Sequence, residues 1–288
     1  MGPAEGAGPF LAAVAKKLSA ERKTDCFILM VGQRRSGKSW ASVKLAEAIG
    51  KLTGLPYIVG QHNFFTLDAF LEAINKKRLK ERQAITIQEL GVNANRRNWY
   101  KEANKAFNSI VQVMGIYRLC VISTLPSLAV LDSTQVLLAN YLLEADTFPN
   151  LRTKRSYFKP RVIAHDPINR KTYFPFFRHR EPGKLVPTIV QKISFGVPEQ
   201  AATFEEMDIA YKKELTKLTQ IELRSNIESL AEAVEMVKRN ADKVTTIRKT
   251  DGRRIFSSSK LRGLGLSSGM AARAKFFMEH GGEKDGAS

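Results

Sequence analysis

The stretch GQRRSGKS, residues 32–39, constrains the fold of this chain more than any other feature. It fits the pattern G-x-x-x-x-G-K-[ST] at every fixed position, which here are Gly32, Gly37, Lys38 and Ser39. A short apolar run precedes it, and a segment of helix-forming residues follows it. Between a strand and a helix, the glycines let the backbone curl so that its N–H groups and the positive end of the helix face one anion. The sequence therefore predicts a phosphate-binding loop.

The loop implies ATP and Mg²⁺ as cofactors. Lys38 would neutralise charge on the β- and γ-phosphates, and Ser39 would give its hydroxyl group to Mg²⁺. The side chains of Arg34 and Arg35 at the loop apex could face solvent, a neighbouring subunit or the nucleotide. The residues expected to contact the nucleotide are Gly32, Gln33, Arg34, Arg35, Ser36, Gly37, Lys38, Ser39 and Trp40.

Strands and helices alternate along the first half of the chain. The predicted strands are residues 25–31, 55–60, 84–88 and 118–124. The predicted helices are residues 38–49, 66–77 and 98–114, and residues 126–146 are expected to add a helix and a strand. Apolar strands that alternate with helices indicate an α/β fold, a P-loop NTPase with a mainly parallel sheet flanked by helices.

ITIQELG, residues 85–91, lies where a nucleotide hydrolase needs acidic residues at the end of a nearby strand. Glu89 is the candidate for polarising the attacking water. Gln88 stands where the metal-side aspartate is expected, and its amide oxygen is a weaker ligand for Mg²⁺ than a carboxylate. Thr124, at the end of another strand, could reach between Glu89 and the γ-phosphate. Both strand ends could instead be plain caps, and Gln88 leaves the rate of hydrolysis open.

The composition changes after the predicted core. Residues 152–184 hold ten Lys or Arg against two acids and predict a basic β-hairpin around the turn HDPINRK. Residues 201–240 carry apolar positions in steps of three and four, typical of a long amphipathic helix, with a bend or break between 221 and 227. The last segment predicts two short helices joined at GLSS, either a helix-turn-helix or a partner-binding tail. The expected organisation is an N-terminal helical arm (1–24), a P-loop ATPase core with the basic hairpin (25–198), a long amphipathic helix (199–245), a candidate helix-turn-helix module (246–280) and a disordered tail (281–288).

The net charge of +18 and the pI of about 9.9 exceed what solubility needs. An anionic partner is therefore expected, either nucleic acid or an acidic membrane surface. No apolar run approaches the roughly 18 residues that cross a bilayer, and the N-terminal segment has its basic residues on the wrong side for a signal peptide. Cys26 and Cys120 lie in apolar runs without the spacing of a metal or redox site. We expect a cytoplasmic protein with no membrane span and with reduced, buried thiols.

The motifs GQRRSGKS, ITIQELG and VISTLPSL together resemble the phosphate loop, the second acidic motif and the polar strand end of ring-forming ATPases of the FtsK/HerA type. The resemblance covers about residues 25–178 and is closest to the small zonular-occludens-toxin-like ATPases of archaeal viruses, plasmids and integrated elements. It implies an ATP-driven motor that threads DNA as a homo-oligomeric ring, such as a hexamer, with partner proteins encoded by the same element. Gln88 and Leu125 depart from the family pattern, which has aspartate and glutamine at these positions.

The resemblance also implies residues that act on a neighbouring subunit and on DNA. In such rings an arginine of one subunit touches the γ-phosphate bound by the next, and the candidates are Arg118, Arg96 and Arg97. Cations and aromatics after the acidic motif, among them Trp99 and Tyr100, could bind phosphate and stack on bases, or Trp99 could pack in the core. A solvated charge run would show the same pattern. The residues expected to contact DNA are Arg96, Arg97, Lys154, Arg155, Arg170, Lys171, Arg253 and Arg254.

Three functions are compatible with these features. An ATP-hydrolysing motor on DNA, for translocation, packaging or transfer, would use every motif. A nucleotide-gated DNA-binding or assembly protein with little or no hydrolysis would suit a glutamine at position 88. A P-loop kinase is the third, although its acceptor pocket usually needs a longer stretch than the one between Lys38 and Glu89.

Overall fold

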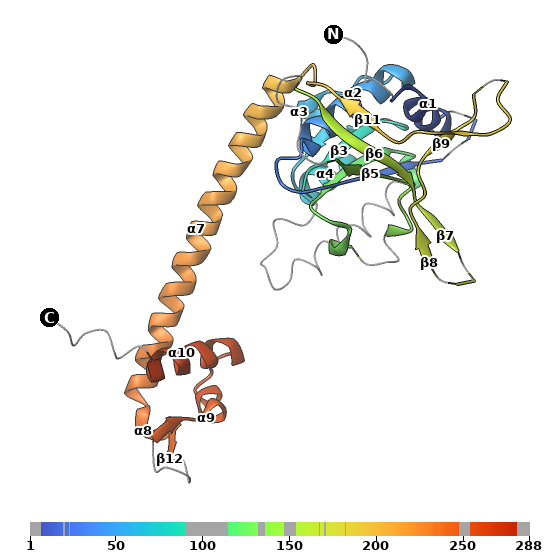
Figure 1. Ribbon diagram of the computed structural model, residues 1–288. Coiled ribbons are helices and arrows are strands. Elements are labelled where there is room, and N and C mark those ends of the chain that lie inside the picture. Colours follow the sequence, from blue (N-terminus) through green and yellow to red (C-terminus); the bar gives the residue numbers. More distant parts are fainter. Residues whose placement is uncertain are drawn as a thin grey trace. The chain divides into compact units, whose positions relative to one another are not determined.

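The computed structural model describes residues 7–19, 21–22, 24–89, 115–131, 136–146, 154–166, 168–169, 171–181, 183–247 and 254–280 (Figure 1). The chain divides into two compact units, Met1–Tyr211 and Lys212–Ser288, each with its own hydrophobic cluster. The expected helix 98–114 and the expected disordered tail 281–288 lie outside the described residues.

The first unit is built on one central sheet. Its helices are α1 (Gly8–Lys17), α2 (Lys38–Thr53), α3 (Val59–His62), α4 (Leu67–Asn75), the 3₁₀ turn η1 (Leu128–Val130) and the start of α7 (Ala201–Arg239). Its strands are β1 (Cys26–Val31), β2 (Asn63–Phe64), β3 (Ala84–Ile87), β4 (Cys120–Leu125), β5 (Tyr141–Ala145), β6 (Ser156–Val162), β7 (Ala164–Asp166), β8 (Lys171–Tyr173), β9 (Arg178–His179), β10 (Thr188–Ile189) and β11 (Ile193–Phe195).

The central sheet has the strand order β11-β6-β5-β1-β4-β3-β2. The run from β2 through β3, β4 and β1 to β5 is parallel, whereas β6 and β11 are antiparallel to their neighbours. The register of β1 and β4 runs from Cys26 opposite Cys120 to Val31 opposite Leu125. This mainly parallel sheet, flanked by helices, confirms the predicted α/β fold class.

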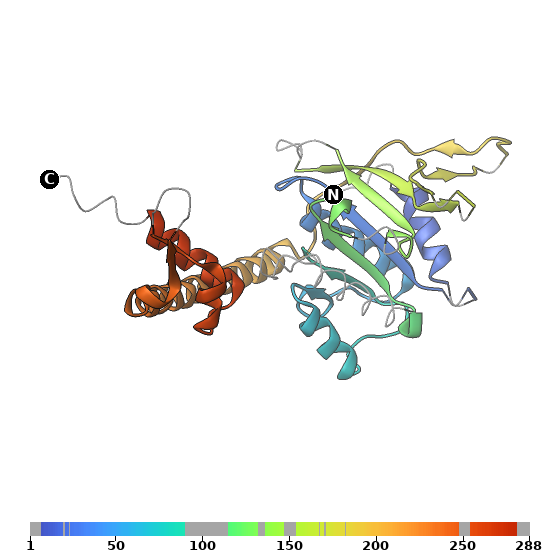
Figure 2. The ribbon, with the colours of Figure 1, turned by 90° about the horizontal axis from the view of Figure 1, so that it is seen from below.

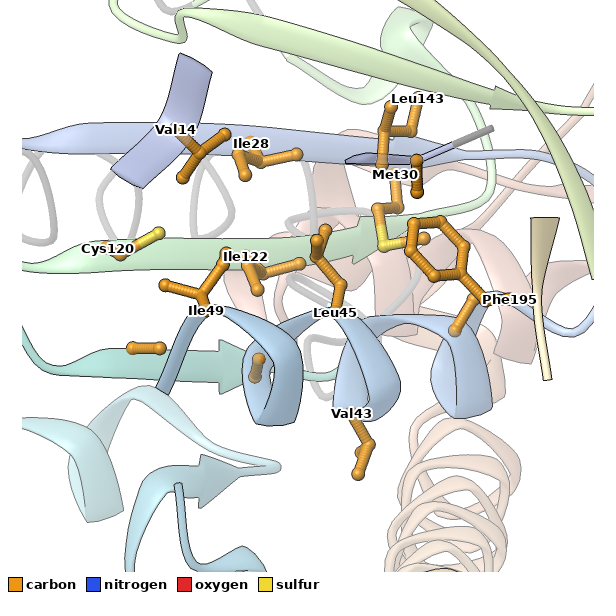
Figure 3. Packing of buried hydrophobic residues seen from close by; sticks show 14 of the residues in the cluster. Val14, Ile28, Met30, Val43, Leu45, Ile49, Cys120, Ile122, Leu143 and Phe195 are labelled. Atoms are coloured by element: carbon orange, nitrogen blue, oxygen red, sulfur yellow. The ribbon is translucent and has the colours of Figure 1, made fainter. Parts of the chain in front are cut away.

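The two faces of the sheet carry separate apolar clusters, because successive residues of a strand point to opposite faces. On one face Ile28 packs with α1 and α2, and on the other Phe27 packs with α4. Figure 3 shows Leu45 and Ile49 of α2 pointing toward the strands, while Val43 points away from them. The apolar run 26–31 is therefore a strand buried on both faces, as its continuous apolar pattern indicated.

The N-terminal helix α1 belongs to this core. Its Phe10 and Val14 side chains are completely buried in the cluster under α2. The Phe10 ring meets Tyr141 and Phe177 edge-on, with ring centroids 5.2 and 5.5 Å apart. This segment thus contributes to the stability of the first unit.

Cys26 and Cys120 lie side by side on β1 and β4, and both are free and buried. A hydrogen bond with Cys26, together with burial, raises the pKa of the Cys120 thiol well above its usual value. A thiol that stays protonated is a poor nucleophile. The prediction of buried cysteines is confirmed.

The strand predicted over residues 55–60 is wrong. This segment approaches helix α3, and the edge strand β2 is only Asn63–Phe64. Apolar content suggested a strand, but the imidazole of His62 accepts a hydrogen bond from the Ile58 N–H at 2.9 Å. That local bond closes a helical turn at Ile58 instead of leaving the backbone free for a ladder.

The basic segment 152–184 differs from a single hairpin. Its first strand, β6, pairs with β5 in the central sheet, because Phe158 and alternate residues of β6 are buried there. Only β7 and β8 form the expected hairpin around the HDPINRK turn, and β9 pairs with β10 beyond it. Farther along the chain, Ile193–Phe195 forms the edge strand β11, which pairs with β6. The long helix was expected to bend or break between residues 221 and 227. It does not break, because α7 is continuous there.

The second unit gathers small elements on the end of α7. These elements are α8 (Ala241–Val244), β12 (Thr245–Ile247), β13 (Arg254–Phe256), α9 (Ser258–Gly263) and α10 (Ser268–His280). Its cluster joins Val234 and Val237 of α7 to Leu261 of α9 and Ala274 of α10, and Figures 1 and 2 both show α9 and α10 against the last turns of α7. Although α7 has 39 residues, no helix in the described part of the chain combines the length and apolar character that crossing a membrane requires.

Candidate functional site

The phosphate loop connects the end of β1 at Val31 to the start of α2 at Lys38. Gly37 is the N-cap residue of α2 and has φ of 81°, a left-handed conformation that glycine adopts without strain. Gly32 allows close packing, because a Cβ atom there would lie 2.5 Å from the Ala145 Cβ of β5 and 3.1 Å from the Ser36 Oγ. The two glycines of the sequence pattern are thus required by the geometry of the loop.

The Lys38 side chain folds back over the loop. Its Nζ donates hydrogen bonds to the carbonyl oxygens of Gly32 and Gln33, both at 2.7 Å, and to the Ser36 Oγ at 3.4 Å. Burial lowers the pKa of Lys38, and the negative charge of Glu89 acts in the opposite direction. The ammonium group therefore sits where an additional anion would stabilise its charged form.

The other loop side chains divide into exposed and covered groups. Gln33, Arg34 and Arg35 are exposed, and Arg35 has φ of 64° at the loop apex. Ser36 is buried, and Ser39 and Trp40 are half-buried at the start of α2. The two arginines thus point to the surface side of the loop, where a nucleotide or a neighbouring subunit could still reach them.

The second motif meets the loop at the same edge of the sheet, because β1, β4 and β3 are parallel and end together. Since β4 lies between β1 and β3, Thr124 stands between the loop and Glu89. The Thr124 Oγ1 accepts a hydrogen bond from the Glu89 N–H at 2.8 Å. Glu89 has φ of 45° and is exposed, so its carboxylate emerges beside the loop. The sequence placed Lys38, Glu89 and Thr124 together, and the structure brings them together.

Gln88, expected as the metal-side ligand, is instead buried in a hydrogen-bond network. Its side-chain amide is 3% exposed, and its Nε2 donates to the Ser42 Oγ at 3.0 Å and to the Asn63 Oδ1 at 2.9 Å. Its Oε1 accepts from the Thr124 Oγ1 at 3.3 Å. These contacts use the amide oxygen as well as both amide hydrogens, so the geometry favours a structural link over metal ligation.

Sequence reasoning missed the partners of Gln88. Ser42 donates its hydroxyl hydrogen to the Ser39 carbonyl at 2.8 Å, which ties the network to α2. Thr86 donates to the Asn63 Oδ1 at 2.7 Å, and the Tyr57 and Thr86 hydroxyls lie 2.6 Å apart. A polar Thr86 in an otherwise apolar strand was the one signal in the sequence that could have pointed to this cluster.

A second polar anchor, also missed, lies farther along α2. The Glu47 carboxylate, 4% exposed, accepts the backbone N–H groups of Glu199 and Gln200 at 2.9 Å each and pairs with Lys44 at 3.4 Å. Gln200 begins α7, since its carbonyl accepts from the Phe204 N–H at 3.0 Å. Its amide bridges back to the core by donating to the Tyr57 carbonyl at 2.8 Å. Glu47 thus fixes the start of α7 to the helix that leaves the phosphate loop.

Arg118 does not reach the phosphate loop of its own chain. It precedes β4 and therefore lies at the opposite edge of the sheet, where it pairs with Glu81. Its predicted action on the nucleotide of a neighbouring subunit stays a prediction. Arg96 and Arg97, the other candidates for that role, lie outside the described residues, as do Trp99 and Tyr100.

The predicted DNA contacts are only partly described. Lys154 and Lys171 are exposed, whereas Arg155 is half-buried and its Nη1 donates to the Ser194 Oγ at 3.1 Å. Arg254 lies on β13. Arg170 and Arg253 lie outside the described residues. Their roles toward DNA stay predictions.

The residues present fit a nucleotide with Mg²⁺. The half-buried Lys38 ammonium lies at the N-terminus of α2, a place that favours phosphate groups, and Ser39 follows it in the first turn. Among the described residues no group of three or more His, Cys, Asp or Glu could hold a metal alone. Ser39, half-buried at the start of α2, stays a predicted ligand for Mg²⁺.

No protein-family model matches the chain, and no curated protein matches it. Among solved structures, the crystal structure of the FIGL-1 AAA domain is similar to 49% of this chain, with a TM-score of 0.36 and 16% sequence identity. This chain covers 51% of that chain, about half of its length.

Proposed function

We propose that this protein binds ATP with Mg²⁺ at residues 32–39 and hydrolyses it to drive work on DNA. The observation that carries this proposal is the position of the Lys38 ammonium. It lies 2.7 Å from two loop carbonyls, at the positive end of α2, with the charge of Glu89 acting on it. A half-buried cation at the N-terminus of a helix suits a polyphosphate.

Different residues of the chain would bind the phosphates, hold the metal and orient the attacking water. The loop backbone and Lys38 would bind the phosphates, and Ser39 would hold Mg²⁺, which supplies charge neutralisation at the phosphate oxygens when bound. Glu89 would orient the attacking water, because its carboxylate emerges at the same edge of the sheet as the loop. Thr124 would fix Glu89 by accepting its backbone N–H.

The work on DNA is inferred from charge and from resemblance. The net charge of +18 and the exposed Lys154 and Lys171 support binding to a polyanion. The resemblance to FtsK/HerA-type motors of archaeal mobile elements supports translocation, packaging or transfer by a homo-oligomeric ring. In such a ring Arg118, or Arg96 or Arg97, would act on the nucleotide of the adjacent subunit.

ATP hydrolysis with and without DNA tests the proposal. Lys38→Ala should abolish ATP binding, and Glu89→Gln should keep binding but reduce hydrolysis by 100-fold or more, on the order of general-base contributions. Lys51→Ala, which removes an exposed lysine from the same helix, is the matched control and should behave as wild type. DNA should increase the rate of ATP hydrolysis by the wild type, and this increase should fall steeply as the salt concentration rises. Failure of the wild type to retain ATP would overturn the proposal.

A nucleotide-gated DNA-binding or assembly protein is the second candidate. The buried hydrogen bonds of Gln88 favour it, because they give a structural use to the position where a metal-binding aspartate was expected. Tight ATP binding without phosphate release, even with DNA, would select this function.

A further inference from the structure

We propose that Gln88 is a positioning residue whose side-chain amide, through both its hydrogens and its oxygen, holds α2 and the Glu89 backbone in register, and that a carboxylate cannot replace it. This inference rests on the proposed function, in which α2 carries the phosphate loop and Glu89 acts on water. It reverses the interpretation from sequence alone, which took Gln88 for a weakened metal ligand.

The hydroxyl of Ser42 requires a donor at position 88. Its hydrogen is committed to the Ser39 carbonyl at 2.8 Å, so the side of Ser42 that faces Gln88 presents a lone pair. The Gln88 Nε2 fills that need at 3.0 Å. Through Ser42, the amide therefore acts on the backbone of the residue that would hold Mg²⁺.

The second amide hydrogen meets the same requirement at Asn63. The Asn63 Oδ1 accepts from the Thr86 hydroxyl at 2.7 Å and from the Gln88 Nε2 at 2.9 Å. This contact fixes the plane of the Gln88 amide against β2 and β3. Because the Nε2 group is held by two acceptors, its Oε1 has one direction left, toward β4.

The amide oxygen secures Glu89 through Thr124. The Thr124 Oγ1 accepts the Glu89 N–H at 2.8 Å, so its own hydrogen is available for the Gln88 Oε1 at 3.3 Å. Glu89 has φ of 45°, a left-handed conformation that residues with a Cβ seldom adopt. One buried amide thus connects the backbone of Ser39 to the strained backbone of Glu89.

A carboxylate at position 88 would break this connection. It offers acceptors only, so it would face the lone pairs of Ser42 and Asn63 without a hydrogen between them. It would also carry a charge in a place where the present side chain is 3% exposed. Restoring the aspartate of the resembling family should therefore impair the site.

The test compares Gln88→Glu, Gln88→Asp and Gln88→Leu in the full chain. Each should lower the rate of ATP hydrolysis by tenfold or more, while the dissociation constant for ATP with Mg²⁺ changes by less than about threefold. In the nucleotide-free protein, amide hydrogen exchange at Glu89 should become tenfold faster or more, as it should in Thr124→Val. The double variant Ser42→Ala/Gln88→Glu should lose less hydrolysis rate than the losses of the two single variants multiplied together, because both changes remove the same hydrogen bond.

Gln83→Glu is the matched control. Gln83 is also 3% exposed, and its Nε2 donates to the Pro56 carbonyl at 3.1 Å, but it lies at the opposite end of β3. The same chemical change there should leave both Glu89 exchange and the hydrolysis rate within about twofold of wild type.

The outcomes separate this inference from the proposed function. A Gln88→Asp protein that hydrolyses ATP faster, or that needs less Mg²⁺ for half-maximal rate, would overturn the inference while the ATPase function stands. A wild type that releases no phosphate would overturn the function, and Glu89 exchange in the Gln88 variants would still decide the inference. Unchanged exchange in Gln88→Glu would reject it.

Discussion

Helices α2 and α7 begin in opposite ways. The N–H groups that lead into α7 are met by the Glu47 carboxylate, an anion supplied by the chain itself. Helix α2 begins at Gly37, which has no side chain to act as a cap, and carries Lys38 in its first turn without an acidic residue there. Each helix N-terminus attracts negative charge, but only α7 has that charge built in.

The difference supports the proposal that α2, and not α7, begins at a ligand site. Two further helices resemble α7, since the Thr66 hydroxyl caps α4 and the His62 imidazole accepts the Ile58 N–H at α3. Where a side chain of the protein accepts the N–H groups at a helix N-terminus, the contact stabilises the fold. Where it leaves an end with a cation and no anion, an external phosphate can complete it. This difference between the helices can be tested by adding a carboxylate at the start of α2 and by removing the groups that close α7, α3 and α4.

The largest expected effect follows from removing the anion of α7. Glu47→Ala would leave the Glu199 and Gln200 N–H groups without their acceptor and Lys44 without a buried partner. We expect the free energy of unfolding to fall by about 3–4 kcal/mol. Thermal or denaturant unfolding measures it. The exposed Glu199 offers the control: Glu199→Gln should cost less than about 1 kcal/mol, and equal losses in both variants would refute the anchor.

The closure at α3 should depend on pH. Burial, with a smaller contribution from the charge of Lys80, lowers the pKa of His62 from 6.5 to about 4. Because the folded pKa lies below the unfolded one, the stabilisation is complete above pH 6.5 and is lost as the pH falls toward 4. The loss should approach about 2–3 kcal/mol for a shift of this size.

Comparing the wild type with His62→Asn isolates that contribution. Asparagine keeps an acceptor near the Ile58 N–H but does not titrate. Unfolding at pH 7.5 and pH 4.5 should show a smaller difference for the variant than for the wild type. His165→Asn, at an exposed position on β7, should leave the pH dependence as it is. A variant as sensitive to acid as the wild type would contradict the role of His62.

Introducing an acidic side chain in the first turn of α2 tests the difference between α2 and α7 directly. Ser39→Asp would place a carboxylate in the first turn of α2, and we expect it to stabilise the nucleotide-free protein by about 0.5–1 kcal/mol. The same charge would repel a phosphate by about 2 kcal/mol, a loss of about 30-fold in ATP affinity. Calorimetric titration and thermal unfolding measure both effects. Ser39→Ala, which adds no charge, should lose less affinity, and equal losses would show that repulsion is not the cause.

The sequence predicted the ligand site at the start of α2 but not the contacts between distant residues that close the start of α7. Glycine spacing and an apolar run are short-range patterns, so Gly32, Gly37 and the strand before them were found. Glu47 and Gln200 are separated by 153 positions and Gln88 and Ser42 by 46, and nothing local marks such pairs. The strand predicted over residues 55–60 failed for a different reason: a local hydrogen bond, from the Ile58 N–H to His62, outweighed apolar content. Long-range polar contacts must be seen in the fold.

The smallest effect is expected at α4, which is closed by a neutral group. The Thr66 Oγ1 accepts the Ala69 N–H at 3.2 Å, and Asp68 also lies in the first turn. Thr66→Ala should therefore cost about 1 kcal/mol in the free energy of unfolding, and Thr66→Ser should restore most of it because the hydroxyl returns. ATP affinity should stay unchanged in both variants. If Thr66→Ala weakened ATP binding as much as Ser39→Asp is expected to, the cap of α4 and the proposed ligand site at the start of α2 would not be independent of each other.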